Sequence, residues 1–247
     1  KMIRYRCSFC HNTYDEKLSY CGGCRNKKFS QITIKDSLLE SDLEILKETT
    51  LFEKILTESN KRAVGEEKAK KSLILFCMGR LVKNADASSF NAIPHEESGT
   101  GKDYLTKTMT SLCVPKEELI HRTRISPTVL NYWHDPQEEP DWSWDGKVLF
   151  LEDVSDSILN HDVMKTFLSG GSDTTITING KAVDRKINGK PIIILTTANS
   201  SPKSEQLRRI QFIPLDSSKE QTRRIKQFKA QLAKDGLTPR FDENLTQ

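Results

Sequence analysis

Apolar residues recur three and four positions apart along three stretches of the chain, and this period predicts α-helices. The first stretch covers residues 36–59, with Asp36 or Ser37 as the N-cap, and the second covers residues 66–81. The second is acidic at its start and basic toward its end, which complements the helix macrodipole. The third stretch, residues 103–113, directly follows a glycine-bearing turn.

Two apolar runs have the pattern of buried strands. VLFL at 148–151 and IIIL at 192–195 each pass directly into polar residues. Such runs are typical of parallel strands, whose carboxyl ends carry functional groups. Between them TTITINGKAV alternates around Asn-Gly, which predicts a β-hairpin over residues 174–184. The pattern predicts an α/β fold, a parallel sheet with helices on both faces and an inserted β-hairpin.

Composition indicates an ordinary globular protein. Of the 247 residues, 36% are hydrophobic and 29% charged, and the net charge of +4 is so mild that nucleic-acid binding would depend on local clusters. No apolar run approaches the roughly 18 to 20 residues that cross a bilayer. The opening KMIRYRCSFC has no signal-peptide pattern, so we expect a cytoplasmic protein without membrane contact, which is either a fragment of a longer chain or an unusually short machine. Residues 138–146, rich in Pro, Asp and Trp, predict an exposed turn.

Two C-x-x-C pairs lie near the N-terminus, formed by Cys7, Cys10, Cys21 and Cys24. This spacing favours a structural Zn²⁺ site in a compact zinc ribbon over residues 1–36, rather than two disulfides or a redox motif. Basic and aromatic residues are interleaved in the same segment. They could bind nucleic-acid phosphates and stack on bases, or they could simply solvate a small domain that zinc holds together.

The stretch HEESGTGKDY, residues 95–104, is close to the phosphate-binding P-loop pattern G-x-x-x-x-G-K-[ST]. The expected phosphate contacts come from Ser98, Gly99, Thr100, Gly101, Lys102 and Asp103. Two positions depart from the pattern. Glu96 replaces a glycine, and Asp103 replaces the hydroxyl that binds Mg²⁺, although a carboxylate could hold Mg²⁺ directly or through water.

Further polar groups that could serve ATP hydrolysis follow along the chain. Glu152 and Asp153 end the first apolar run, where one carboxylate could hold Mg²⁺ and the other orient the attacking water. Asn199, beyond the second run, could polarise that water. Arg208 and Arg209 are candidates for an arginine finger that reaches a neighbouring subunit's γ-phosphate. The alternative is a pair of core strands that happen to end in acids, with a surface arginine pair.

These segments carry a family resemblance over roughly residues 50–225. ESGTGKD, VLFLED, IIILTTAN and LRRIQFIPLD resemble the Walker A, Walker B, sensor-1 and arginine-finger segments of AAA+ ATPases. VGEEKAKKSLILFCMGRL resembles a helix of minichromosome-maintenance helicases, and FLEDVSD, the hairpin and TTAN together are similar to superfamily-three helicases of viruses and plasmids. RISPTVLNYW…GKVLFLED resembles helicase-primases of phages and mobile elements.

The resemblance implies roles for the candidate residues. Lys102 would contact the β- and γ-phosphates, and Glu152 and Asp153 would share the metal and catalytic-base roles. Asn199 would be the sensor. One arginine of the 208–209 pair would act in trans, which requires a homo-oligomer, most simply a hexameric ring. Lys181, beside the hairpin tip, would bind DNA.

The expected domains are the zinc ribbon, an AAA+ core over 37–216 and a basic helix within 217–247 that begins a helical lid. The expected function is that of an ATP-dependent DNA helicase or helicase loader in the replication of a viral or mobile element. It would use ATP, Mg²⁺ and Zn²⁺, act on single-stranded or forked DNA and interact with other replication proteins. The alternatives are a non-hydrolysing nucleotide- and DNA-binding initiator or scaffold, and an AAA+ transcription activator, whose GAFTGA loop is missing here.

Overall fold

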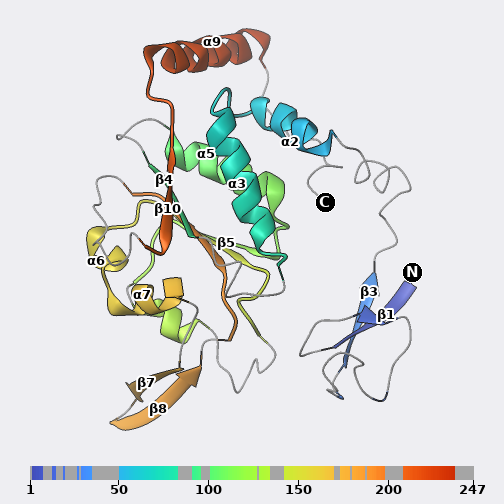
Figure 1. Ribbon diagram of the computed structural model, residues 1–247, viewed down its shortest axis with the longest axis vertical. Coiled ribbons are helices and arrows are strands. Elements are labelled where there is room, and N and C mark those ends of the chain that lie inside the picture. The colour runs from blue at the N-terminus through green and yellow to red at the C-terminus, as the bar shows by residue number, and fades with distance from the viewer. Residues whose placement is uncertain are drawn as a thin grey trace. The chain divides into compact units, whose positions relative to one another are not determined.

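The computed structural model divides the chain into two compact units, Lys1–Leu51 with Glu139–Asp141, and Phe52–Glu138 with Trp142–Gln247 (Figure 1). It describes residues 2–7, 13–14, 19, 27, 29–34, 50–82, 91–95, 101–126, 128–133, 142–169, 173–178, 180–186, 188–197 and 208–236. Among the helices of these ranges, none combines the length and apolar character needed to cross a membrane.

The first unit contains a three-stranded antiparallel sheet. Its strands are β1 (Met2–Cys7), β2 (Thr13–Tyr14) and β3 (Phe29–Ile34), in the order β2-β1-β3. Cys7 is the last residue of β1, whereas Cys10, Cys21 and Cys24 lie outside the described residues. The zinc site therefore stays a prediction.

A five-stranded parallel sheet forms the centre of the second unit. The strands follow the order β10 (Ile210–Pro214), β4 (Asn91–His95), β9 (Ile192–Leu195), β6 (Val148–Leu151) and β5 (Leu119–Arg122). The two apolar runs of the sequence are thus parallel strands, as predicted, and the structure shows them as neighbours. Strand β9 separates the strand before the P-loop from the strand that ends in two acids.

Helices cover both faces of this sheet. Side chains alternate between the two faces along each strand, so each buried strand contributes to two apolar clusters. Alternate residues of β6 and β9 pack with α2 (Leu51–Asn60), α3 (Glu67–Gly79) and α5 (Lys102–Cys113). The others pack with η1 (Val129–Tyr132), α6 (Asp156–Leu159) and α7 (Asp162–Ser169). Figure 1 shows α3 and α5 on one side of the strands and α6 and α7 on the other. All residues of β6 and β9 are buried, which explains their unbroken apolar sequence.

Most of the predicted elements are confirmed. Helices α3 and α5 match the second and third periodic stretches, while the first is described only from residue 50 onward, where it contains α2. The hairpin forms from β7 (Asp173–Ile178) and β8 (Lys181–Lys186), which pair as a separate two-stranded sheet.

The prediction of an exposed turn over residues 138–146 is wrong for Trp144, which is fully buried. Its ring contacts those of Trp133, Trp142 and Phe167, with centroid distances of 5.2, 4.8 and 5.0 Å. The backbone N–H of Trp144 also donates to the carbonyl of Asn188 at 2.9 Å. An aromatic ring contributes so much apolar area that this segment folds onto the second core despite its polar neighbours.

Helix α9 (Lys219–Asp235) confirms the predicted basic helix, and its start is fixed to the loop before α3. The buried side chain of Gln221 donates from Nε2 to the carbonyl of Val64 at 2.9 Å. The N–H of Asp216 donates to both carboxylate oxygens of Glu66 at 3.1 Å. Gly65 lies between these contacts at a φ of +74°, where a Cβ would collide with the side chain of Gln221.

Lys70 of α3 is fully buried, and its hydrogen bonds connect α3 to the end of α2. Its Nζ donates to Asn60 Oδ1 at 2.6 Å and to the carbonyl of Ala63. Burial lowers the pKa of Lys70 from 10.5 to about 8, against the opposing effect of Glu67 and Glu66.

We expect Lys70 to make stability depend on alkaline pH. Below about pH 8 the amine is charged in both the folded and the unfolded chain, so its contribution is constant. Between about pH 8 and 10.5 the unfolded chain binds more protons, so the free energy of unfolding should rise by up to about 3 kcal/mol. Denaturant titrations across this range, compared with Lys70→Met, measure the effect. A difference between the two proteins that does not change with pH would contradict it.

Candidate functional site

The candidate site lies at the carboxyl edge of the five-stranded sheet. Because β4, β9 and β6 are parallel, their carboxyl ends share one edge. Helix α5 begins shortly after β4, Thr196 follows β9, and Glu152 and Asp153 follow β6. In open α/β sheets this edge is where ligands bind.

Lys102 is the first residue of α5 and is 6% exposed. The preceding Gly101 has a φ of +85°, and a Cβ there would meet no atom within 4 Å. Glycine is therefore needed at this position for its backbone conformation rather than for space. The start of a helix presents N–H groups and positive partial charge, which favours an anion. Residues 96–100 lie outside the described part of the chain, so the roles of Glu96, Ser98, Gly99 and Thr100 stay predictions.

The side chain of Thr196 connects α5, the helix after the P-loop, to the turn after β6. Its hydroxyl is fully buried, donates to the carboxylate of Asp103 and accepts the N–H of Asp153 at 3.1 Å. The same turn is paired with the backbone of Thr196, whose carbonyl accepts the N–H of Val154 at 2.7 Å. Asp153 has a φ of +47°, an uncommon value for a residue with a side chain. These bonds place the carboxylate of Asp103 and the backbone of Asp153 around one hydroxyl.

This hydrogen bond gives a physical role to the aspartate that stands at position 103 in place of the serine or threonine of the P-loop pattern. A serine or threonine at position 103 could not accept a charge-assisted hydrogen bond from Thr196. Thr196 ends an apolar run, so its place at the edge of the sheet was readable in the sequence. Its partners were not, because they belong to segments far away along the chain.

Glu152 contacts a residue that the sequence analysis missed. His121 of β5 has its Nε2 2.9 Å from Glu152 Oε1, and its ring stacks on Phe150 with a centroid distance of 4.7 Å and an interplanar angle of 12°. His121 is opposite Phe150 in the register of β5 and β6. Strand pairing alone reveals this contact, since β5 is a short and only partly buried strand without a strong sequence pattern.

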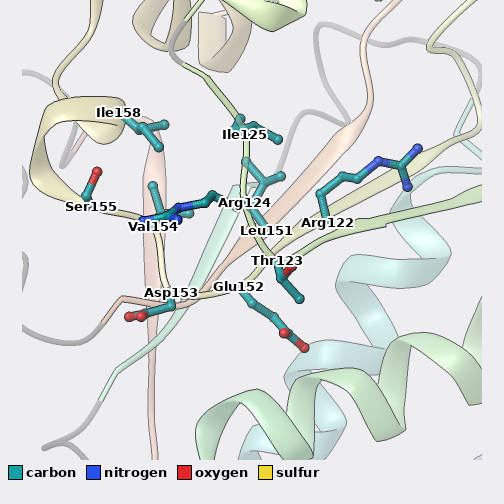
Figure 2. A pocket seen from close by; sticks show the side chains of 10 residues that line it. All are labelled: Arg122, Thr123, Arg124, Ile125, Leu151, Glu152, Asp153, Val154, Ser155 and Ile158. Carbon is teal, nitrogen blue, oxygen red and sulfur yellow. The ribbon is translucent and has the colours of Figure 1, made fainter.

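A pocket of about 420 Å³ opens beside these acids at the ends of β5 and β6. It is lined by Arg122, Thr123, Arg124, Ile125, Leu151, Glu152, Asp153, Val154, Ser155 and Ile158. Figure 2 shows the side chains of Glu152 and Asp153 pointing in different directions. The two adjacent carboxylates therefore face different surroundings.

The residues of this edge fit a nucleotide with Mg²⁺. The cation of Lys102 and the amides that begin α5 suit phosphates, and the carboxylates of Asp103 and Asp153 are oxygen ligands of the kind that Mg²⁺ prefers. Within the described ranges no cluster of three or more His, Cys, Asp or Glu side chains could hold a metal ion. Mg²⁺ would thus need oxygens from the phosphates as well, which is its usual mode of binding.

The two predicted arginines are not brought to this edge. Arg208 and Arg209 directly precede β10, so they lie toward the opposite end of a strand that is parallel to β4. The carbonyl of Arg209 accepts from Asn91 Nδ2 at 3.0 Å. Lys181 begins β8 in the separate hairpin, and its side chain is not among the described ones; Asn199 lies outside the described residues.

The fold and the arrangement at its carboxyl edge define a P-loop domain of the α/β class. The chain belongs to the MTBMA_p00010 P-loop domain family, which matches residues 36–246. No curated protein matches the chain. Family membership supports nucleotide binding and NTPase chemistry at the edge that carries Lys102.

Thr196→Val should separate the segments that the hydroxyl joins. The substitution keeps the branched shape but leaves Asp103 without its donor and the N–H of Asp153 without its acceptor. We expect the free energy of unfolding to fall by about 1 to 3 kcal/mol, as measured by chemical denaturation. Thr197→Val, one residue further along, is the matched control. An equal loss of unfolding free energy in the two variants would show that the hydrogen bonds of Thr196 do not stabilise the fold more than an ordinary buried threonine does.

Proposed function

We propose that the chain is an ATP-dependent DNA helicase or helicase loader of the AAA+ type, acting in the replication of a viral or mobile genetic element. The observation that carries the proposal is the convergence of Lys102, Asp103 and Asp153 at one sheet edge through Thr196. The position of β9 between β4 and β6 also supports it. A strand there can deliver a sensor side chain, such as the proposed Asn199, between the P-loop and the acids.

The geometry supports different roles for the two acids. Asp153, whose backbone is fixed beside Asp103, would hold Mg²⁺. Glu152, which points another way and contacts His121, would orient the attacking water and accept its proton. Lys102 would bind the β- and γ-phosphates. Bound Mg²⁺ would neutralise the charge that develops on the transferred phosphoryl group.

The proposed helicase also binds DNA and assembles into a ring. The resemblance to hexameric helicases supports a ring in which an arginine finger acts in trans, and Arg208 and Arg209 lie away from the carboxyl edge of their own sheet. This placement fits a contact with a second copy of the chain. Lys181 next to the hairpin turn would contact DNA, and a Zn²⁺ ribbon built on Cys7, Cys10, Cys21 and Cys24 would precede the ATPase core.

A nucleotide-binding initiator or scaffold that does not hydrolyse ATP is the second candidate. Two observations favour it: the carboxylate of Glu152 lies against the ring of His121, and the carboxylate of Asp103 accepts a hydrogen bond from Thr196. Both acids thus have protein partners that hydrolysis would require them to leave or share. Glu96 would add negative charge near an anionic ligand.

We expect ATP hydrolysis that single-stranded DNA stimulates and that Lys102→Ala reduces by a factor of about 100 or more. The reason is that the substitution removes the positive charge that stabilises the negative charge developing on the phosphates. Phosphate release with and without DNA is the measurement. Lys107→Ala, at an exposed lysine of the same helix, is the control. A Lys102→Ala protein as active as the parent would refute the assignment of the site.

Glu152→Gln distinguishes the two candidate functions. For a hydrolysing enzyme we expect this variant to bind ATP as tightly as the parent but to lose turnover, because the amide cannot accept the proton from water. Isothermal titration with ATP, with and without Mg²⁺, and a turnover assay provide the comparison. Tight Mg²⁺-dependent binding by a parent protein that shows no turnover would instead support the scaffold.

A further inference from the structure

Helix α9 contains the whole positive charge excess of the chain. It has six Lys and Arg residues against two Asp and Glu, a net charge of +4. The net charge of the full chain is also +4, so the rest of the chain contains as many acidic as basic residues. A mild total charge therefore hides a strongly basic helix.

The charges of α9 are segregated around the helix axis. Ile225, Phe228 and Leu232 follow an i, i+3, i+7 spacing and are half-buried, on the side of the buried Gln221. At about 3.6 residues per turn, the opposite side presents a set of exposed cations. This basic face consists of Lys219, Arg223, Lys226 and Lys234.

Both acids of α9 have partners that lie outside the basic face. Glu220 Oε1 lies 2.5 Å from Arg224 Nη2 in an exposed ion pair. The two carboxylate oxygens of Asp235 accept from Gln231 Nε2 at 2.8 and 2.7 Å. In the described part of the chain, no recorded ion pair includes a cation of the basic face. Its positive charge is thus not compensated by the helix that carries it.

We propose that the basic face of α9 binds the sugar-phosphate backbone of a nucleic acid. From Lys219 to Lys234 the cations extend over roughly 22 Å at about 1.5 Å per residue, long enough to contact several successive phosphates. Around the helix axis Ala230 lies between Arg223 and Lys226, and its small side chain lets a backbone approach closely, while the polar Gln227 borders the face. The face has no aromatic ring to stack on bases, and contacts to phosphates alone carry no sequence information. Binding is therefore independent of sequence.

A lipid surface fits this helix less well. A basic amphipathic helix that lies on a membrane inserts its apolar side chains below the headgroups. On α9 those side chains, Ile225, Phe228 and Leu232, are already half-buried, on the same side as the anchored Gln221. The basic face itself is exposed, and charge complementarity then selects a polyanion.

The anchoring of α9 connects this surface to the nucleotide site. The bonds of Gln221 and Asp216 fix the start of α9 to the loop before α3, and α3 packs against α5, which begins with Lys102. A nucleic acid on α9 is thus held by the unit that would bind ATP. The inference rests on the proposed function only for this connection, since binding itself requires no nucleotide.

The test compares two variants that lose the same charge at different places. In the first, Lys219→Gln, Arg223→Gln, Lys226→Gln and Lys234→Gln neutralise the basic face, and glutamine preserves helix propensity. In the control, Lys68→Gln, Lys71→Gln, Lys107→Gln and Lys116→Gln remove exposed lysines elsewhere. Fluorescence anisotropy measures binding to labelled single-stranded DNA, duplex DNA and RNA at several salt concentrations without ATP, and circular dichroism verifies folding.

We expect the basic-face variant to bind at least about tenfold more weakly at low salt, with its salt slope reduced by about 3 to 4, close to 0.7 to 0.9 per lost phosphate contact. The control should keep most of the parent's slope, and the type of nucleic acid most affected identifies the natural partner. An unchanged slope or an equal loss in the control would overturn the inference. So would a parent protein that sediments with phosphatidylserine vesicles, through the four basic-face residues, but binds none of the three labelled nucleic acids. Lys102→Ala separates the two proposals, because it should reduce phosphate release by a factor of about 100 or more and leave the anisotropy-measured binding intact.

Discussion

The hydrogen bonds of the Thr196 hydroxyl are the contact on which the candidate site depends. This one buried group donates to Asp103 in the helix after the P-loop and accepts from Asp153 in the turn after β6. Its own place at the carboxyl end of β9 is set by the parallel pairing of β9 with β4 and β6. The sheet order is therefore what brings residues from three distant segments to one edge.

Burial on both faces of the sheet makes that edge rigid. The central strands are buried throughout, and two separate apolar clusters hold helices against the two faces. Lys70 and Gln221 add polar anchors outside these clusters, one at the end of α2 and one at the start of α9. The functional groups occupy the exposed margin of a core whose packing leaves their backbones little freedom.

Elements with a strong local signal were predictable from the sequence. The apolar runs of β6 and β9, the Asn-Gly turn of the hairpin and the period of α3 each depend on neighbouring residues. The burial of Trp144 was not predictable, because it depends on the rings of Trp133 and Phe167 and on a backbone bond to Asn188, all separated from it along the chain. The contact of His121 with Glu152 was equally hidden, since only the pairing of β5 with β6 creates it.

Hydrogen–deuterium exchange with a non-hydrolysable ATP analogue and Mg²⁺ tests most directly whether this edge is the nucleotide site. The central claim predicts slower exchange in three places, the first turn of α5, the turn after β6 and the end of β9, and no change in a Lys102→Ala protein. Protection confined to other segments, or protection that survives in Lys102→Ala, would contradict it.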